Sequence, residues 1–589
     1  MEQQQPLVLE REVVHAESFS LSDTEVKALG ILTSGILRPE HIYEIINSPS
    51  FPQFAEALVI IRRDLDSEIP EGGILFAAGP MRSGKTLLAL AIAFSLFHKQ
   101  NVVFAKSKLD ERDPDAIKSA AGPSTAEANF ENFSTVFFGE NNELNNPDTL
   151  RSLLNAELLV IDELLFCSAE ELNILYTIAN ARRADGKWTI ICSLDKDFKR
   201  DPMRGFTDFK ELDPILVDCS ARCARCGLDA VLSQRSIDTG ESLIAASVDD
   251  QVVVAEKGKD HYAPACVYCH ACLEELNPRE EEIFQGHQFL ALTRSLLEDL
   301  SNQAWVGRGE NFEAWQEVRI AEWRTIREES FFNLTRYDVA LLTRITEVYK
   351  LYLQINVSWA DYINALCIEG SVAVGKSTLI ALLRGQYDVP QVKEDVKLNR
   401  WLSFSLSLDP KVRGQTAFPT QVYYRITKIE GLLREMHRIM GILALGGNPA
   451  LTILIDRWLK GDGVFIERHL RQGNISEEEF DILIGLETLF MDKFPKSIYA
   501  ALLVSDVSKM LDRIRIRGRP FETSLTYEDL YRIQEATQEA IIAMGIPPGF
   551  WIAIDTTEDT EPPGVAVLNA FLQFLSSRLL TLPKKVPKF

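Results

Sequence analysis

The chain has 589 residues, of which 46% are apolar and 25% charged, so it can bury substantial hydrophobic cores and is not globally disordered. Its formal net charge of −23 argues against a nucleic acid polymer or an anionic membrane as the main partner, because both attract basic surfaces. Nucleotides are compatible with this charge, since a small phosphate pocket needs only local positive charge. The length predicts about three or four domain-sized units.

Residues 1–69 are expected to form a helical N-terminal extension, because apolar residues recur at helical spacing in Val26–Ile36 and His41–Ile46. The first residues, MEQQQPLVLEREVV, have neither a basic region nor an apolar core, so we expect no signal peptide. The most apolar stretch, Ile439–Ile455, is short and is broken by two glycines, an asparagine and a proline, which disfavours a membrane span. These features predict a cytoplasmic protein.

Residues 70–275 are expected to form an α/β domain. From Gly72 onward, short β-branched or apolar runs each lead into a helix-like segment. The strand-like runs lie at 74–78, 101–106, 134–138, 158–162 and 188–194. This alternation is typical of a mainly parallel sheet covered by helices.

Two further regions follow along the chain. Residues 276–361 are rich in Glu, Arg, Trp and Leu at helical spacing and are expected to form a helical connector. Residues 362–589 are expected to form a second α/β domain, which opens with a strand-like run at 362–370 and has longer helices at Pro419–Met440 and Ser476–Phe494. The two α/β domains share little sequence beyond one loop motif, so they do not resemble a simple tandem duplication.

That loop motif is G-x4-G-K-[ST], and it occurs at Gly79–Thr86 and Gly370–Ser377. Each copy follows a strand-like run and opens a helix-like one, which is the context of a phosphate-binding P-loop. The glycines let backbone N–H groups converge on phosphate oxygens, the lysine meets the outer phosphates and the hydroxyl of Thr86 or Ser377 binds Mg²⁺. The predicted ATP-binding residues are Gly79, Ser83, Gly84, Lys85, Thr86, Gly370, Gly375, Lys376, Ser377 and Thr378. The motif alone does not separate a kinase from an ATPase or a switch.

Six of the nine cysteines lie between Cys219 and Cys272, which favours metal binding over disulfides in a reducing compartment. Two CxxC pairs have the spacing of a tetrahedral four-cysteine zinc site, with ligands Cys223, Cys226, Cys266 and Cys269. Two alternatives are reduced structural cysteines and a different register that uses Cys219, Cys272 or His270.

The motifs of the first α/β domain, in their order, resemble those of the type II, zinc-lasso thymidine kinases. They are GPMRSGKT, LDER (109–112), VIDELLF (160–166), SLDKDFKRDP (193–202), CARCG and GKDHYAPACVYC. The resemblance implies transfer of the ATP γ-phosphate to the 5′-hydroxyl of thymidine or deoxyuridine. It also implies that Glu163 is the base, that Asp162 helps hold Mg²⁺, that Phe166 lines the base pocket and that Tyr262 closes over the nucleoside.

The second α/β domain resembles the deoxynucleoside kinases in five segments. They are CIEGSVAVGKST, EDVKLNRWL (394–402), FPTQVYYRITK (418–428), IDRWLKGD (455–462) and RIRIRGRPFE (513–522). The resemblance implies that Glu394 is the base, Asp456 assists Mg²⁺, Gln421 reads the base edge and Glu522 recognises the 3′-hydroxyl. It further implies an arginine lid that clamps phosphates together with Arg457, formed by Arg513, Arg515, Arg517 and Arg519.

Two features of the second domain carry more specific hypotheses. Lys428 and Asp462 stand where the purine- and cytidine-using branches of the family have a charged pair, which favours deoxyadenosine, deoxyguanosine or deoxycytidine as substrate. The alternative for RIRIRGR is a solvated basic helix face. Alternate arginines do not share one helical face, however, so the lid is the preferred interpretation.

The leading hypothesis is therefore a bifunctional deoxynucleoside kinase for nucleotide salvage, using ATP, Mg²⁺ and Zn²⁺. Its partners would be small-molecule deoxynucleosides and further copies of itself, because related kinases form oligomers. One alternative makes the first domain a degenerate regulatory nucleotide binder, since Leu165 and Ser193 depart from the family motifs. Another is a P-loop ATPase that is not a kinase.

Overall fold

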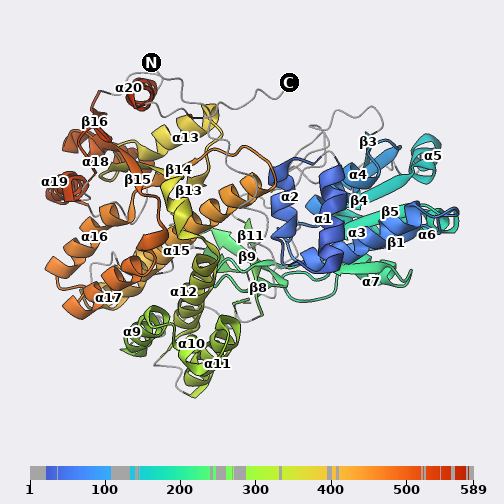
Figure 1. The fold of residues 1–589 in the computed structure, drawn as a ribbon, viewed down its shortest axis with the longest axis horizontal. Coiled ribbons are helices and arrows are strands. Elements are labelled where there is room, and N and C mark those ends of the chain that lie inside the picture. Colours follow the sequence, from blue (N-terminus) through green and yellow to red (C-terminus); the bar gives the residue numbers. More distant parts are fainter. Residues whose placement is uncertain are drawn as a thin grey trace. The chain divides into compact units, whose positions relative to one another are not determined.

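A computed structural model gives the fold of the chain (Figure 1). It describes residues 21–35, 37–107, 133–138, 144, 146–238, 243–246, 260–267, 269–270, 287–329, 334–393, 399, 401–405, 410–518, 522, 525–543, 546–558, 564–578 and 582. The chain divides into two compact units. The first comprises Met1–Ile237, Ala245–Leu276 and Gly441–Asn448, and the second comprises Asp238–Ile244, Asn277–Met440 and Pro449–Phe589.

The first unit is built on a six-stranded parallel sheet with the order β3-β2-β4-β5-β1-β6. Five of these strands confirm the strand-like runs of the sequence; the sixth, β6, was not predicted and is only four residues long. The strands are β1 (Gly73–Ala78), β2 (Val102–Ser107), β3 (Phe133–Phe138), β4 (Leu158–Asp162), β5 (Trp188–Ser193) and β6 (Ile215–Asp218). The helices are α4 (Lys85–Leu96), α5 (Pro147–Asn155), the 3₁₀ helix η2 (Leu164–Phe166), α6 (Ala169–Ala184) and α7 (Arg204–Lys210).

Three N-terminal helices complete the core of this sheet. They are α1 (Asp23–Ser34), α2 (Pro39–Ile46) and α3 (Phe51–Leu65), and α1 and α3 lie side by side next to α4 (Figure 1). Helix α4 is apolar on all sides, so it needs cover on the face that turns away from the sheet. Leu32 and Leu58 supply that cover in one buried cluster with α4. The helices predicted for this region are therefore part of the hydrophobic core of the first unit.

Short antiparallel strands surround the cysteines of the first unit. One sheet has the order β10-β9-β11, with β9 (Leu232–Asp238), β10 (Leu243–Ala245) and β11 (Asp260–Ala265). A separate hairpin pairs β7 (Ala221–Arg222) with β8 (Asp229–Ala230). The sequence predicted a loop here and no strands. Strands β7, β8 and β10 have only two or three residues, and the longer β9 (LSQRSID) and β11 (DHYAPA) show no alternation of apolar and polar residues.

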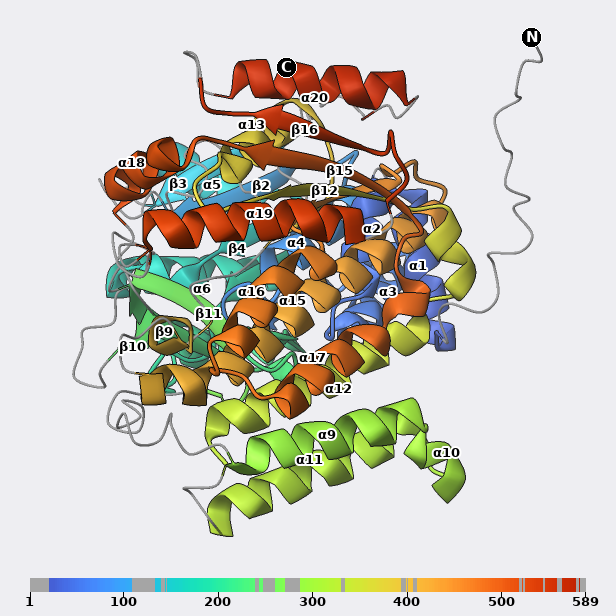
Figure 2. The ribbon, with the colours of Figure 1, turned by 90° about the vertical axis from the view of Figure 1, so that its left-hand side faces the viewer.

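The second unit is built on a five-stranded parallel sheet with the order β13-β14-β12-β15-β16. Its strands are β12 (Asn364–Gly370), β13 (Gln391–Val392), β14 (Thr452–Asp456), β15 (Ser497–Val504) and β16 (Trp551–Asp555). Its helices are α13 (Lys376–Gln386), α14 (Leu402–Ser405), α15 (Pro410–Ala444), α16 (Leu459–Arg471), α17 (Glu477–Thr488), η5 (Met491–Lys493), α18 (Val507–Arg517), α19 (Tyr527–Ala543) and α20 (Val565–Ser577). Helix α20 packs along β16 and α13 (Figure 2).

The two sheets differ in the strand that neighbours the P-loop strand. In the second unit β12 pairs directly with β14, which ends at Asp456. In the first unit β5 lies between the P-loop strand β1 and β4, which ends at Asp162. The prediction that the two halves are not a simple tandem duplication is therefore confirmed.

The predicted connector is helical and belongs to the second unit. It consists of α9 (His287–Ser301), α10 (Ala304–Arg308), α11 (Phe312–Glu329), α12 (Arg336–Gln354) and the 3₁₀ helix η4 (Val357–Asp361). Trp305 and Tyr349 meet edge to face, with ring centroids 5.6 Å apart. Arg344 on α12 donates a hydrogen bond to Glu430 on α15 at 2.7 Å. The last connector helix is thus tied to the main helices of the second unit.

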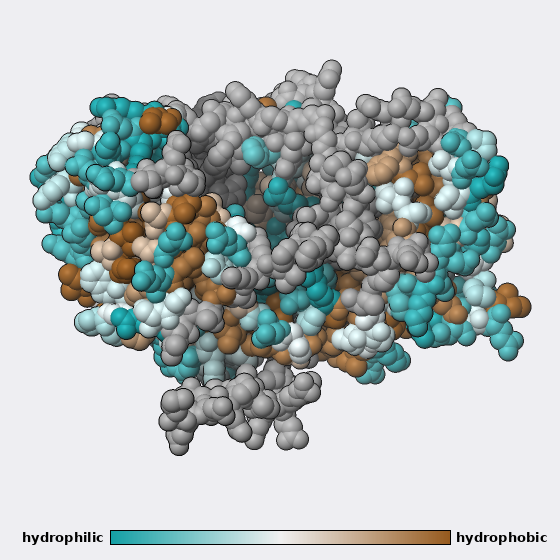
Figure 3. Space-filling view, turned by 90° about the horizontal axis from the view of Figure 1, so that it is seen from above, coloured by the Kyte–Doolittle hydropathy of each residue, from teal (hydrophilic) through white to brown (hydrophobic). Residues whose placement is uncertain are grey.

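The described surface is mixed in hydropathy. On the face shown in Figure 3, hydrophilic and hydrophobic residues are interspersed in small groups. Among the helices that the structure describes, none is both long and apolar enough to cross a membrane.

A substitution tests the role of the N-terminal helices. Leu58 on α3 is fully buried, so Leu58→Asp should destabilise the first unit by about 3 kcal/mol or more, because it places an unpaired carboxylate in the core. Val26 on α1 is 55% exposed, and Val26→Asp should change stability by less than about 0.5 kcal/mol. Thermal unfolding followed by circular dichroism measures both. Equal melting temperatures for the two variants would contradict the packing.

Candidate functional site

The first P-loop turns sharply between β1 and α4. Gly79 has φ 146°, and a Cβ at this position would lie 2.0 Å from the carbonyl oxygen of Cys219, so only glycine fits. Gly84, with φ 85°, caps the N-terminus of α4. The Lys85 Nζ donates hydrogen bonds across the loop to the carbonyl oxygens of Gly79 at 3.1 Å and Pro80 at 2.7 Å. Backbone N–H groups at a helix N-terminus together with this ammonium group form a site for an anion.

Two carboxylates stand beside this loop. The Thr86 hydroxyl donates to the carboxylate of Asp162 at 3.1 Å, which joins the start of α4 to the end of β4. Both Asp162 and the next residue, Glu163, are buried. Glu163 has φ 63°, and its backbone N–H donates to the carbonyl oxygen of Cys192 at 2.8 Å. A hydroxyl and a carboxylate that face each other suit Mg²⁺, and a second carboxylate at the strand end suits base chemistry.

A buried lysine near this acid was missed by the sequence reasoning. Lys106 lies in register with Asp162 on the neighbouring strand, so the two side chains are on the same face of the sheet. Lys106 is only 1% exposed. The signal in the sequence was a lysine that ends an otherwise apolar strand-like run. Its position makes it a candidate for balancing negative charge near the P-loop.

The antiparallel sheet contacts the P-loop from the side. Tyr262 on β11 is buried in a cluster with Phe198, against which Met81 of the P-loop also packs. The backbone N–H of Met81 donates to the Ser233 hydroxyl on β9 at 2.9 Å. The structure places Tyr262 beside Met81 of the P-loop, and its role in closing over the nucleoside stays a prediction. Phe166 is half-buried at the end of the 3₁₀ helix that follows Glu163.

The four predicted metal ligands form one cluster. The sulfur atoms of Cys223, Cys226, Cys266 and Cys269 all lie within 4.8 Å of one another, and all four residues are buried. The set fits a tetrahedral zinc ion, which would stabilise the loop that carries Tyr262.

The alternative ligands are engaged elsewhere or lie outside the described residues. Cys219 is not part of the cluster; its thiol forms a hydrogen bond with the side chain of Ser50. The ring nitrogens of His270 lie 3.2 Å from the Arg200 Nε and 3.2 Å from the Ser233 carbonyl oxygen. Cys272 lies outside the part of the chain that the structure describes.

Removal of one ligand tests the metal site. Cys266→Ser should lower the zinc content of the purified protein from about one ion per chain to near zero and should lower the melting temperature of the first unit, because structural zinc contributes directly to folding. Metal content by mass spectrometry and thermal unfolding measure both effects. Cys167→Ser, outside the cluster, is the control and should retain the metal. Full zinc content in the Cys266 variant would exclude this ligand set.

The second P-loop repeats the geometry of the first. Gly370 has φ 139°, and a Cβ there would lie 2.5 Å from the carbonyl oxygen of Leu503 on β15. Gly375, with φ 98°, caps α13. The Lys376 Nζ donates to the carbonyl oxygens of Gly370 at 3.1 Å and Ser371 at 2.7 Å.

Arg457 reaches the same loop from the adjacent strand. It follows Asp456 at the end of β14 and has φ 62°. Its Nη2 donates to the carbonyl oxygen of Gly370 at 3.1 Å, so Arg457 and Lys376 share one acceptor. Two cations that converge on one point at the mouth of a P-loop suit the binding of phosphate oxygens.

A buried ion pair occupies the other side of this site. Gln421 and Lys428 are seven residues apart on α15 and therefore lie on one face of the helix; both are buried. Lys428 forms an ion pair with Asp462 on the first turn of α16. The structure thus brings together the predicted charged pair.

Glu369 was missed by the sequence reasoning and lies at the centre of these groups. It is fully buried at the end of β12, and its Oε1 accepts a hydrogen bond from the backbone N–H of Trp458 at 2.6 Å. Burial raises the pKa of this carboxyl group from its ordinary value of 4.5 to about 7. The signal in the sequence was an acidic residue directly before Gly370, the first glycine of the second P-loop.

This pKa predicts a pH effect on stability. The carboxyl group is protonated more readily in the folded chain than in the unfolded one, so stability is lost as the pH rises from 4.5 through about 7. The loss is about 3 kcal/mol by this pKa difference. Glu369→Gln removes the titration, so its melting temperature relative to the original protein should be higher at pH 8 than at pH 5. A constant difference between these pH values, measured by calorimetry, would contradict the raised pKa.

The arginine-rich segment is divided between different partners. Arg513 on α18 donates to the carbonyl oxygens of Ala373 in the P-loop at 3.3 Å and Thr556 at 2.5 Å. Arg515 is exposed and pairs with Asp512, whereas Arg517 pairs with Glu522. Arg519 and the predicted base Glu394 lie outside the described residues. The phosphate-clamping role of these arginines stays a prediction.

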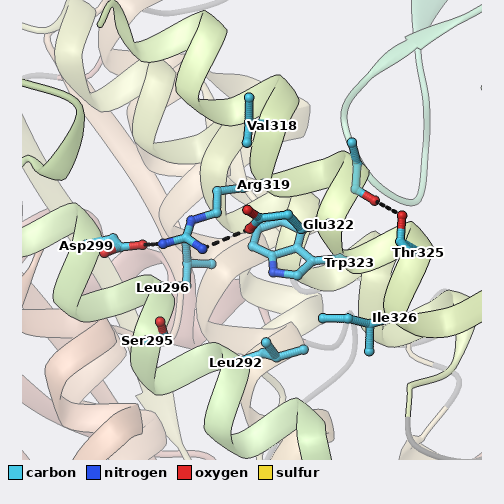
Figure 4. Close-up of a pocket in the computed structure, with 11 residues that line it drawn as sticks. Leu292, Ser295, Leu296, Asp299, Val318, Arg319, Glu322, Trp323, Thr325 and Ile326 are labelled. Carbon is cyan, nitrogen blue, oxygen red and sulfur yellow. Dashed lines mark hydrogen bonds and ion pairs between the residues drawn. The ribbon is translucent and has the colours of Figure 1, made fainter. Parts of the chain in front are cut away.

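A hollow of about 560 Å³ lies apart from these groups, between α9 and α11 of the connector (Figure 4). Arg319 on its wall is paired with both Asp299 and Glu322. Much of the remaining lining is apolar, including Leu292, Leu296, Val318, Trp323 and Ile326. The arginine is already neutralised, so this hollow has no counterpart to the phosphate chemistry of the P-loops.

Comparison with protein families agrees with both sites. Residues 72–270 match the thymidine kinase family, and residues 366–562 match the deoxynucleoside kinase family. The chain is therefore a fusion of a thymidine kinase-family segment and a deoxynucleoside kinase-family segment.

Proposed function

We propose that the chain is a bifunctional deoxynucleoside kinase in which each half transfers the γ-phosphate of ATP to the 5′-hydroxyl of a different deoxynucleoside. The observation that carries the proposal is the convergence of Lys376 and Arg457 on Gly370, together with the pairing of Thr86 with Asp162. Phosphoryl transfer needs positive charge beside the phosphates. Lys376 and Arg457 would supply it at the second P-loop, and Mg²⁺ held by Thr86 and Asp162 would supply it at the first.

In the first half we assign thymidine or deoxyuridine as the substrate. Thr86 and Asp162 would hold Mg²⁺, which neutralises charge on the phosphates, and Glu163 would accept the proton of the 5′-hydroxyl. Tyr262, packed beside the P-loop, would close over the nucleoside with Phe166 in the base pocket. The family match at 72–270 and the four-cysteine cluster support this assignment.

In the second half we assign a purine deoxynucleoside or deoxycytidine as the substrate. Gln421 would read the base edge, because an amide offers both a donor and an acceptor. The buried Lys428–Asp462 pair supports a polar base edge over the methyl group of thymine. Arg457 would stabilise the transferred phosphoryl group, Ser377 and Asp456 would hold Mg²⁺, and Glu394 would act as the base.

We further propose that the enzyme works in nucleotide salvage in the cytoplasm and as a homo-oligomer. These points depend on the family resemblance. Sedimentation of the purified chain tests the oligomeric state.

The function is tested by inactivating one P-loop at a time in the full chain. Lys85→Met should lower thymidine phosphorylation by on the order of 100-fold or more, because it removes a phosphate-stabilising charge, and should leave the other activity unchanged. Lys376→Met should do the reverse. Both variants are assayed with ATP and each of the four deoxynucleosides.

The outcomes separate the alternatives. A second half that phosphorylates thymidine best would refute its assigned base preference. If Lys85→Met changed only the regulation of the second activity, the first half would be a nucleotide-binding regulatory domain. ATP hydrolysis at the same rate with and without nucleosides would exclude a kinase.

A further inference from the structure

We propose that Glu369 is a positioning residue of the second site, which holds Arg457 in its phosphate-facing conformation and supports the Lys428–Asp462 pair. The inference rests on the proposed kinase function of that half. Glu369 itself is fully buried, and it acts through its neighbours.

The end of β12 holds the Arg457 turn at three consecutive residues. The Arg457 N–H donates to the carbonyl oxygen of Ile368 at 3.2 Å, and the Trp458 N–H donates to Glu369 Oε1 at 2.6 Å. The Arg457 side chain donates to the carbonyl oxygen of Gly370 at 3.1 Å. Of these three contacts, only the one from Glu369 is made by a side chain of β12 and can be altered by substitution.

The backbone of Arg457 needs such support. Its φ of 62° lies in the left-handed region, which is unfavourable for a long side chain and persists only where neighbouring groups enforce it. A short hydrogen bond to the next backbone N–H fixes the peptide that follows Arg457. Loss of this bond would let the turn relax and would move the guanidinium group away from Gly370.

The second oxygen of Glu369 lies against the first turn of α16. A Cβ at Gly461 would lie 2.5 Å from Glu369 Oε2, so the carboxylate packs directly against the backbone of this glycine. Asp462 is the next residue and carries the ion pair with Lys428. Oε2 itself has no hydrogen-bond partner among the described residues. The carboxylate therefore touches both the turn that bears Arg457 and the turn that bears Asp462.

Charge explains why an acid stands here. The charged groups that act on Glu369 are Arg457 on the turn after β14, Asp462 on α16 and Lys428 on α15. With Glu369 ionised, these two cations are balanced by two anions. Burial favours the neutral form, so Glu369 is ionised only above about pH 7, and in that range a neutral substitute removes the attraction that holds Lys428 and Arg457.

The test separates positioning from simple core packing. Glu369→Gln keeps the shape and an acceptor for the Trp458 N–H but removes the charge, and Glu369→Leu removes both. For the best deoxynucleoside of the second half, we expect kcat to fall about 10-fold in the Gln variant and about 100-fold in the Leu variant. The KM for ATP should stay within about threefold, because the P-loop lysine is untouched.

A matched control is Glu487→Gln. Glu487 on α17 is another buried acid of the same unit and pairs with Arg425 on α15 at 2.6 Å. It should lower the melting temperature and leave kcat within about threefold of the original value, when assayed well below the melting temperature. Thymidine phosphorylation by the first half serves as an internal standard for the amount of active protein.

Two outcomes would overturn the inference. One is a wild-type kcat in Glu369→Gln, a variant designed to fold even if the Leu variant does not. The other is an equal fall of kcat in the Glu369 and Glu487 variants in proportion to their loss of stability. By contrast, if the second half of the unsubstituted protein phosphorylated no deoxynucleoside, the proposed function itself would be refuted.

Discussion

Both halves depend on one close backbone approach, that of the first P-loop glycine to the neighbouring strand. A Cβ at Gly79 would lie 2.0 Å from the carbonyl oxygen of Cys219, the residue after β6. A Cβ at Gly370 would lie 2.5 Å from the carbonyl oxygen of Leu503 on β15. The absence of a side chain lets the chain turn there and enter the next helix within a few residues. The lysine can then fold back over the loop carbonyls, and the helix N-terminus faces the same point.

The P-loops of the two halves are contacted by side chains from different neighbouring elements. In the second half, β14 lies directly beside β12, so the residue after its terminal aspartate reaches the Gly370 carbonyl with a side chain. In the first half, β5 separates β1 from β4, and contact is made by Thr86 on α4 with Asp162 instead. The two halves therefore differ in the side chain that the strand end brings to the P-loop or its helix: Arg457 in the second half and Asp162 in the first.

The features that could be predicted from the sequence are those defined by residues close together in the chain. The P-loops, the CxxC pairs and the apolar strands are each defined by residues within one short segment. Glu369 and Lys106 escaped prediction because their roles depend on residues of other segments: Trp458, in the turn after β14, for Glu369 and Asp162, on β4, for Lys106. The packing of α1 and α3 on α4 also depends on residues far apart in the chain, although a helix as apolar as α4 already implied a covering layer.

The residue that follows the terminal aspartate of the strand is acidic in the first half and basic in the second. In VIDE (160–163) and LIDR (454–457), a buried strand ends in aspartate, and the next residue has φ 63° in Glu163 and 62° in Arg457. This left-handed turn directs the following side chain at the edge where both P-loops open. A glutamate there can serve as a base, whereas an arginine can only stabilise phosphate. Arg457 cannot accept the proton of a hydroxyl, and this agrees with the proposal that another acid, Glu394, which follows β13 by two residues in the sequence, is the base of the second half.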